Sequence, residues 1–137
     1  MMKIELIDIT DEYDHQGVET FLYDIFVPEM SRFVGRCEFR NETGRDLRFY
    51  GNIGYVIYPP YRGKNLAYRA TLALFDILAI KKPDVHEVIL TCNPDNIASQ
   101  KIIRRLSGTY VETVDVDTDH ELYHMGETQK EIYTVKL

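Results

Sequence analysis

The sequence predicts an α+β fold with a mixed sheet, and three observations support this prediction. The first half of the chain is rich in segments whose apolar residues alternate, as they do in strands. After Pro59-Pro60 the apolar period changes to that of a helix, and a helix–strand–helix unit with two closing strands follows. The 137 residues match the size of one compact domain, so we expect a single domain over residues 1–137.

Three strands are predicted in the first part of the chain. Apolar residues alternate over residues 2–10, and residues 20–27 are aromatic and β-branched with one apolar face. The polar residues 11–19 between them indicate a turn. Residues 32–40 resume the strand pattern after a break, which makes them a candidate hairpin partner of the second strand.

A long fourth strand is predicted over residues 47–58, after a turn at residues 41–44. Gly51 and Gly54 lie inside this segment. Glycine within a strand indicates a bulge, or a close approach by another backbone or a ligand.

An amphipathic helix is predicted over residues 64–81, because its apolar residues recur at helical spacing. Residues 87–92 then predict a short, mostly apolar strand. A second helix follows, with Asn93 as its N-cap, Pro94 in its first turn and Gly108 at its end.

Two strands close the chain, at residues 110–116 and 131–137, with a loop over residues 120–127 between them. In that loop His120 and His124 lie four residues apart, a spacing that can bind a metal when it falls on a helix. No third ligand is apparent in the sequence, so we favour a solvated loop and expect no metal site.

The composition argues against several classes of protein. Hydrophobic residues make up 45% and charged residues 28%, which is typical of a globular protein and not of a disordered one. No apolar run approaches the roughly 18 residues that a membrane helix needs, and the first residues lack a signal peptide's apolar stretch. Cys37 and Cys92 are too few for a disulfide scaffold, so we expect reduced thiols and a cytoplasmic protein.

The net charge of −6, from 22 acidic and 16 basic residues, disfavours a general nucleic-acid binder. It leaves room for an anionic ligand, because backbone amides at a helix start can bind phosphate. Such a site is indicated where the long strand enters the first helix. There Gly63 permits close approach, Asn65 tolerates a left-handed conformation, and Arg62 and Lys64 add positive charge. A generic strand-to-helix turn with solvated basic residues is the alternative that this pattern leaves open.

The same loop resembles that of a known family. R-G-K-N-L-A, residues 62–67, is similar to the acyl-CoA pyrophosphate loop of the GNAT N-acetyltransferase superfamily, whose pattern is Gln/Arg-x-x-Gly-x-Gly/Ala. Arg62 and Ala67 match the two ends of the pattern, and Asn65 replaces its middle glycine. N-P-D-N-I-A-S, which opens residues 93–108, resembles the family's second helix motif, Asn-x-x-Ala/Ser. Together the two blocks look similar to an uncharacterised bacterial branch of predicted acetyltransferases.

The resemblance implies a GNAT-like α+β fold, mostly antiparallel, with a central parallel strand pair that splays apart to admit acetyl-CoA as cosubstrate. The splay falls between residues 55–58 and 90–92. A backbone amide near Ile57 is implied to polarise the thioester carbonyl, as an oxyanion hole does. The cofactor-binding residues that the resemblance implies are Val56, Ile57, Tyr58, Arg62, Gly63, Lys64, Asn65, Leu66, Ala67, Asn96 and Ser99.

The resemblance also implies N-acetyltransferase activity by direct aminolysis, in which a primary amine of a small molecule or peptide attacks acetyl-CoA. Many relatives carry a tyrosine acid at the position of about Ile103, which has no proton to donate, so Tyr110 is the candidate substitute. Glu38, Asp46 and Tyr55 are the candidates for the base, acting through water. The net-acidic chain favours cationic acceptors such as polyamines or aminoglycosides.

One departure from the family concerns the acceptor pocket. Relatives carry two helices between their first and second strands, whereas residues 11–19 leave space for about two helical turns. We therefore expect a shortened N-terminal helical region and an acceptor site that is open, reduced or completed by a partner chain, and we favour a homodimer. The alternative function is a non-catalytic acyl-CoA-binding or regulatory module on the same fold. A surface whose role is dimer formation is a third.

Overall fold

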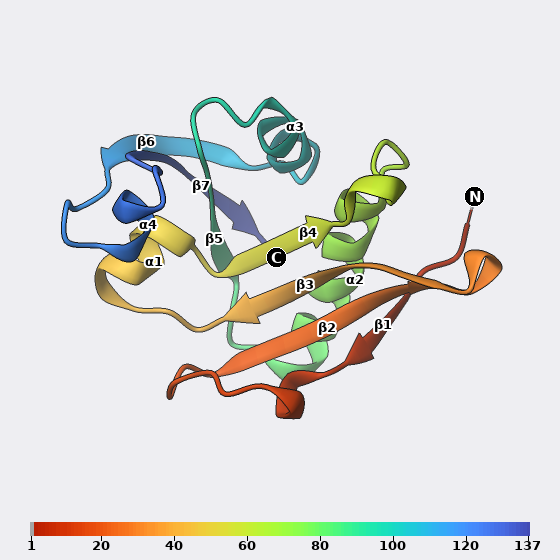
Figure 1. Cartoon of the computed structure of the whole chain (residues 1–137). Coiled ribbons are helices and arrows are strands. Elements are labelled where there is room, and N and C mark those ends of the chain that lie inside the picture. The colour runs from red at the N-terminus through yellow and green to blue at the C-terminus, as the bar shows by residue number, and fades with distance from the viewer. Residues whose placement is uncertain (1) are drawn as a thin grey trace.

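Figure 1 shows the structure, a computed structural model that describes residues 2–137. Within these residues the strands form two antiparallel sheets, one in the order β1-β2-β3-β4 and the other in the order β5-β7-β6. The strands are β1 (Glu5–Asp8), β2 (Thr20–Val27), β3 (Arg32–Arg40), β4 (Ile53–Ile57), β5 (Glu87–Cys92), β6 (Thr109–Asp115) and β7 (Gln129–Lys136).

The helices connect the strands, and the longest of them supports the first sheet. The α-helices are α1 (Gly44–Tyr50), α2 (Leu66–Lys81), α3 (Ile97–Arg105) and α4 (Glu121–His124), and the 3₁₀ turns are η1 (Thr10–Glu12), η2 (Pro28–Met30) and η3 (Pro59–Tyr61). Helix α2 contacts β3 and β4 and lies behind them in Figure 1. Across residues 2–137, none of the helices combines the length and the apolar character that a membrane crossing requires.

One apolar core joins both sheets to α2. Val27 and Val34 from the first sheet, Leu74 and Leu78 from α2, and Leu90 from β5 are each at most 1% exposed. Burying such a side chain completely contributes about 1.5–3 kcal/mol relative to leaving it in water. Strand β4 also contributes buried side chains to this core, so the core fixes β4 against α2 and, with them, the loop that joins the two.

The predicted α+β fold is confirmed. The strands predicted over residues 20–27, 32–40 and 87–92 are confirmed at both ends. Among the described residues the connection from β1 to β2 contains one short helical element, η1, so the N-terminal helical region is indeed short. The predicted splayed pair, β4 and β5, is divided between the two sheets and shares no ladder within residues 2–137.

The long strand predicted over residues 47–58 is wrong in its first part, because residues 44–50 form α1 and β4 begins after it. Gly51 ends the helix. Its φ of 72° lies in the region that favours glycine, and its N–H donates to the carbonyl of Leu47 at 3.0 Å. The helix is too short to display a helical period, and Leu47 and Phe49 alternate as they would in a strand.

The second predicted helix begins later than expected, and Asn93 is not its N-cap. Helix α3 begins at Ile97, and Asn96 caps it by accepting the N–H of Ser99 at 3.1 Å. A turn closed by the N–H of Asn96 and the carbonyl of Asn93, 2.9 Å apart, precedes the helix. Asparagine suits both an N-cap and a turn, so residue type alone did not separate the two positions.

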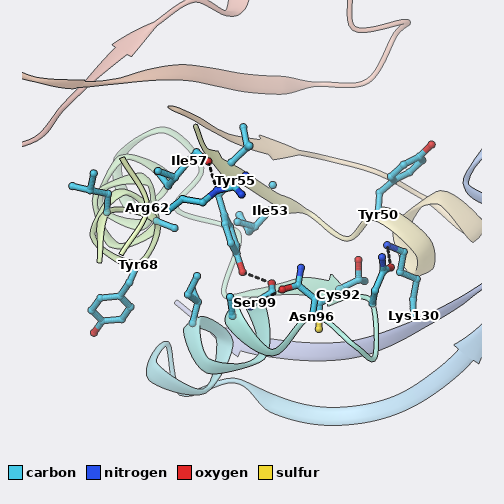
Figure 2. Close-up of a pocket in the computed structure, with 18 of the residues that line it drawn as sticks. Tyr50, Ile53, Tyr55, Ile57, Arg62, Tyr68, Cys92, Asn96, Ser99 and Lys130 are labelled. Atoms are coloured by element: carbon cyan, nitrogen blue, oxygen red, sulfur yellow. Dashed lines mark hydrogen bonds between the residues drawn. The ribbon is translucent and has the colours of Figure 1, made fainter. Parts of the chain in front are cut away.

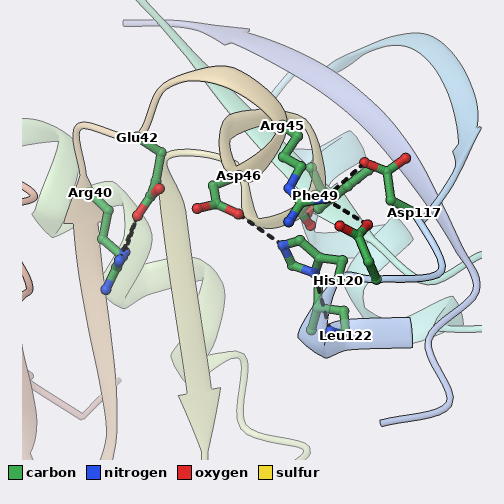
Figure 3. Close-up of polar contacts among 10 residues, drawn as sticks. Arg40, Glu42, Arg45, Asp46, Phe49, Asp117, His120 and Leu122 are labelled. Atoms are coloured by element: carbon green, nitrogen blue, oxygen red, sulfur yellow. Dashed lines mark hydrogen bonds and ion pairs between the residues drawn. The ribbon is translucent and has the colours of Figure 1, made fainter. Parts of the chain in front are cut away.

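Helix α4 lies where a loop was predicted, and His120 holds it against α1 (Figure 3). The buried imidazole accepts the N–H of Leu122 at Nδ1, which leaves the proton on Nε2 for Asp46, 2.8 Å away. Phe49 packs edge-on against the ring at 5.0 Å between centroids. His120 is therefore a structural link. Within residues 2–137, no three His, Cys, Asp or Glu side chains form a group that could hold a metal ion.

Candidate active site

A cleft opens between β4 and β5, at the boundary of the two sheets (Figure 2). The cleft is closed at one end by the residue before β4, where the N–H of Asn52 donates to the carbonyl of Ile89 at 2.7 Å and the Oδ1 of Asn52 accepts the N–H of Ile89 at 2.9 Å. The cleft beyond this junction has a volume of about 680 Å³, which is in the usual range of ligand sites.

Strand β4 presents backbone amides to this cleft. It is the edge strand of its sheet, and the N–H of Tyr58 donates to the carbonyl of Val34 on β3 at 2.8 Å. In an antiparallel ladder, hydrogen-bonded pairs alternate with pairs that make no such bonds. The N–H groups of Tyr55 and Ile57 consequently point away from β3 and toward the cleft that these residues line.

The loop before α2 and the first turn of α2 form one end of the cleft. Gly63 (φ 84°) and Asn65 (φ 62°) both have left-handed backbone, which turns the chain into the helix. The helix begins with a bond from the N–H of Arg69 to the carbonyl of Asn65 at 3.3 Å, and the Asn65 side chain caps no amide. The amides of residues 66–68 therefore lack helical partners and are available to an anion.

Two arginines hold this end of the cleft in place. The Nε of Arg62 donates to the carbonyl of Ile57 at 2.9 Å, so its side chain lies along β4 (Figure 2). Arg105, at the end of α3, lies over the ring of Tyr68 at 4.0 Å and hydrogen-bonds the side chain of Asn65. These contacts join the loop to β4 on one side and to α3 on the other.

Two hydroxyl groups meet across the middle of the cleft. Tyr55 comes from β4 and Ser99 from the first turn of α3, and their oxygens are 2.6 Å apart (Figure 2). Burial raises the pKa of Tyr55, and the hydrogen bond with Ser99 partly offsets this effect. The phenol of Tyr55 therefore keeps its proton at neutral pH and can donate it.

Cys92 and Lys130 also line the cleft. Burial raises the pKa of the Cys92 thiol to about 11, so it stays protonated at neutral pH and is a poor nucleophile. Lys130 is 8% exposed, and its Nζ donates to Asn93 and to Glu127, both at 2.6 Å. A buried ammonium held by two acceptors closes that part of the wall.

The structure brings most of the predicted site residues together. Tyr110 does not reach the cleft: it is half-exposed on β6, its ring packs on Tyr133, and its hydroxyl is 2.8 Å from that of Thr113. Tyr58 and Lys64 are not among the lining residues either. The predicted residues that do line the cleft are Tyr55, Val56, Ile57, Arg62, Gly63, Asn65, Leu66, Ala67, Asn96 and Ser99.

Among the lining residues that sequence reasoning missed are Tyr50, Tyr68 and Lys130. Tyr68 had a signal, since it is an aromatic residue directly after the predicted phosphate loop. Tyr50 belongs to the helix that was predicted as a strand, and Lys130 comes from β7, far along the chain. No local pattern connects these two with the loop.

Residues 3–109, which are most of the chain, match the sequence profile of the acetyltransferase (GNAT) domain. The chain belongs to the GNAT acetyltransferase family. This GNAT chain is also 33% identical over 54 residues to the uncharacterised N-acetyltransferase YnaD of Bacillus subtilis, a match that covers 39% of the chain and 31% of YnaD. The resemblance of the two sequence blocks to this family is thus confirmed.

Solved acetyltransferases share the fold of this GNAT chain. The GNAT-family acetyltransferase from Bacillus anthracis has a TM-score of 0.66 at 20% identity, over 84% of this chain and 65% of its own. The microcin C7 self-immunity acetyltransferase MccE, solved with acetyl-CoA and AMP, has a TM-score of 0.66 at 17% identity, over 86% of this chain and 61% of its own. The chain thus spans less than two thirds of the length of each of these relatives.

Proposed function

We propose that this GNAT domain transfers the acetyl group of acetyl-CoA to a primary amine of a small molecule or peptide by direct aminolysis. The observation that carries the proposal is a cleft with the backbone amides of β4 along one wall and the unpaired amides of α2 at one end. An acyl-CoA matches this cleft, since its pantetheine amides can pair with a strand and its pyrophosphate with a helix start. Membership of the family and the acetyl-CoA in MccE support the proposal.

The residues of the cleft divide into two tasks in this proposal. The amides of residues 66–68, together with Gly63 and the Arg62 side chain, bind the pyrophosphate. The N–H of Ile57 donates to the carbonyl oxygen of the thioester, where negative charge develops during the reaction. Asn96 acts indirectly, because its side chain caps α3 and thereby places Ser99 in the cleft.

Tyr55 is the acid that we assign to the leaving thiolate. The position at which many relatives carry a tyrosine, Ile103, is apolar and fully buried. Tyr55 instead reaches the cleft from β4 and keeps its proton because burial raises its pKa. As the carbon–sulfur bond breaks, the phenol gives this proton to the thiolate of CoA, and Ser99 orients the phenol through their hydrogen bond.

A non-catalytic acyl-CoA-binding module is the second candidate, and the short connection between β1 and β2 favours it. The pairing of Tyr55 with Ser99 favours the transferase, because a binding module needs no proton donor beside the thioester. Release of free CoA thiol on addition of amines separates the two. Turnover with an amine supports the transferase, whereas binding without turnover across polyamines, amino sugars, amino acids and peptides supports the module.

Calorimetric titration with acetyl-CoA tests the first step of the proposal, and we expect a Kd in the micromolar to sub-millimolar range, about 1 μM–1 mM. Arg62→Glu/Gly63→Asp adds negative charge and a strained residue to the loop, so we expect affinity to fall by more than about tenfold. Lys64→Glu is the matched control, because it changes charge at an exposed residue that does not line the cleft. Absence of binding at millimolar acetyl-CoA refutes the proposal, and unchanged affinity in Arg62→Glu/Gly63→Asp shows that the loop is misassigned.

We also propose a cytoplasmic homodimer. β6 is an edge strand with nearly all its side chains exposed, including Tyr110 at 52% and Val111 at 50%. An unpaired edge of this kind is suited to pairing with a second copy of the chain. Sedimentation over a range of concentrations tests the dimer, and a monomer at every concentration contradicts it.

The cytoplasmic location that we propose is supported by the two buried free cysteines, Cys37 and Cys92, because thiols stay reduced in a reducing compartment.

A further inference from the structure

We propose that a second cavity, which adjoins the cleft at Gly54, is the acceptor site and binds a small amine with more than one positive charge, such as a diamine or polyamine. The inference rests on the proposed function and names its class of acceptor. It is carried by the position of this cavity, by one carboxylate at its inner wall and by the charges around its rim.

The second cavity lies at the start of β4, whereas the loop that we assign to the pyrophosphate follows the end of that strand. It has a volume of about 560 Å³ and is enclosed by residues 14–18, by β3, and by the segment from α1 into β4. Tyr50, Ile53 and Gly54 line both cavities. This shared wall places an amine bound in one cavity next to a thioester bound in the other.

Glu38 lies at the shared wall. It is the β3 partner of Gly54 on β4. A Cβ atom added to Gly54 would come within 3.2 Å of Oε1 and 3.3 Å of Cγ of Glu38, so the carboxylate lies directly against the glycine. The absence of a side chain at residue 54 thus leaves this carboxylate at the boundary between the two cavities.

The carboxylate of Glu38 has no hydrogen-bond or ion-pair partner among residues 2–137. The neighbouring Arg40 is occupied by Glu42, with its Nε 2.9 Å from Oε1. Burial raises the pKa of Glu38, while the charges of Arg40 and His15 act in the opposite direction. An ammonium group supplies the missing partner, and a carboxylate with a raised pKa is suited to accept its proton.

The rim of the cavity supplies attraction for a second positive charge. The other acidic and basic side chains that line it are Asp14, His15, Arg40, Glu42, Asp46 and Glu121. Glu42 is paired with Arg40, and Asp46 is hydrogen-bonded to His120, so these two carboxylates already have partners within the protein. Asp14 and Glu121 remain as exposed carboxylates that no cation of residues 2–137 pairs with.

The reaction balances with the groups described. Glu38 takes a proton from the bound ammonium, and the amine nitrogen then bonds to the carbonyl carbon of the thioester. The carbon–sulfur bond breaks with its electron pair on sulfur, and Tyr55 gives its proton to that sulfur. The nitrogen loses its second proton to solvent as the amide forms, and transfer of the proton held by Glu38 to Tyr55 through solvent restores both residues.

Titration calorimetry on the protein saturated with CoA tests acceptor binding independently of turnover, with spermidine and propylamine as the two probes. We expect spermidine to bind at least about tenfold more tightly, with the difference narrowing as salt is added. Asp14→Asn/Glu121→Gln removes the two rim charges, and we expect spermidine affinity to fall about 2–20-fold, on the scale of exposed charge pairs. Glu29→Gln, exposed on η2 away from both cavities, is the control and leaves the affinity unchanged.

Glu38→Gln completes the test. We expect spermidine still to bind to this variant, while its acetylation falls by about 10²-fold or more because the base is lost. Equal affinity for spermidine and propylamine, or a rim variant with unchanged spermidine affinity, overturns the inference and leaves the proposed function standing. Absence of acetyl-CoA binding overturns both.

Discussion

Replacing Tyr55 by phenylalanine tests the assignment of the acid with the smallest change, because it removes one hydroxyl oxygen and keeps the ring. That oxygen lies 2.6 Å from the Oγ of Ser99, a residue that is 9% exposed. Loss of a hydrogen bond of this kind costs about 0.5–1.5 kcal/mol, and leaving its partner unsatisfied brings the cost to the upper end of about 1–3 kcal/mol. We therefore expect the melting temperature to fall by several degrees, at about 3–5 °C per kcal/mol for a domain of this size.

The effect on catalysis is expected to be much larger than the effect on stability. A positioned general acid contributes about 10²–10⁴-fold to a rate, so kcat of Tyr55→Phe should fall by that factor, measured as release of free CoA thiol. Acetyl-CoA affinity, measured by calorimetry, should change by less than about threefold, because the hydroxyl acts on the leaving group.

The pH dependence gives a second signature of the same residue. The acid must carry its proton, and burial raises the pKa of Tyr55, so the wild-type rate should decline only as the pH rises through that raised value. The phenylalanine variant should lack this decline. Tyr58→Phe is the control, since Tyr58 does not line the cleft and its loss should leave kcat unchanged. A Tyr55→Phe enzyme with kcat within about threefold of wild type would refute the assignment.

Three further predictions concern the fold around the site. In Gly35→Ala the new Cβ would lie 2.0 Å from the carbonyl oxygen of Val56, so β4 must move away from β3. Denaturant titration should show a free energy of unfolding lower by more than about 3 kcal/mol, and a decrease below about 1 kcal/mol contradicts this prediction. His120→Ala removes the link between α1 and α4 and should lower the free energy of unfolding by about 2–4 kcal/mol. Asp46→Asn keeps an acceptor for the Nε2 proton and should lower it by less than about 1 kcal/mol in the same assay. Equal losses in the two variants contradict the assignment of that proton to Nε2. Burial raises the pKa of Glu38, so the folded protein holds that proton more tightly than the unfolded chain does, and stability should fall as the pH rises from the ordinary glutamate range through the raised pKa. Glu38→Gln should lack this decrease in the free energy of unfolding when unfolding is measured between about pH 4 and pH 8. Parallel curves of stability against pH for the two proteins contradict the prediction.

The parts of the fold that the sequence predicted well are long strand segments with clear breaks at both ends. β2 and β3 are eight and nine residues long, Pro28 to Ser31 separates them, and both were predicted at their observed ends. α1 has seven residues, in which two apolar positions alternate as in a strand, so hydrophobic pattern could not distinguish a helix. Gly51, which ends α1, has a positive φ, but glycine adopts positive and negative φ about equally well. Its presence in the sequence therefore did not predict the end of a helix.

The candidate site divides in the same way. The phosphate loop is contiguous, so its residues were found from one motif and lie together in the cleft. Tyr55 and Ser99 are 44 residues apart and come from different elements, and their contact depends on the angle between β4 and α3. No local pattern encodes that angle. Tyr110 was predicted as the acid because it follows α3 in the sequence, but its side chain is half-exposed on β6 and packs on Tyr133.

The junction at Asn52 gives the molecule a mechanical property. The residue before β4 is bonded to β5 there, and the two strands belong to separate sheets, so the cleft is a wedge whose narrow end is this junction. A ligand that pairs with β4 and also contacts α3 joins the two walls of the wedge and opposes their separation. The free energy of unfolding should consequently increase with ligand concentration, by about 2.7 kcal/mol at a hundred times the Kd. In the protein without ligand, the distance between the two walls of the wedge should be the part of the structure that fluctuates most.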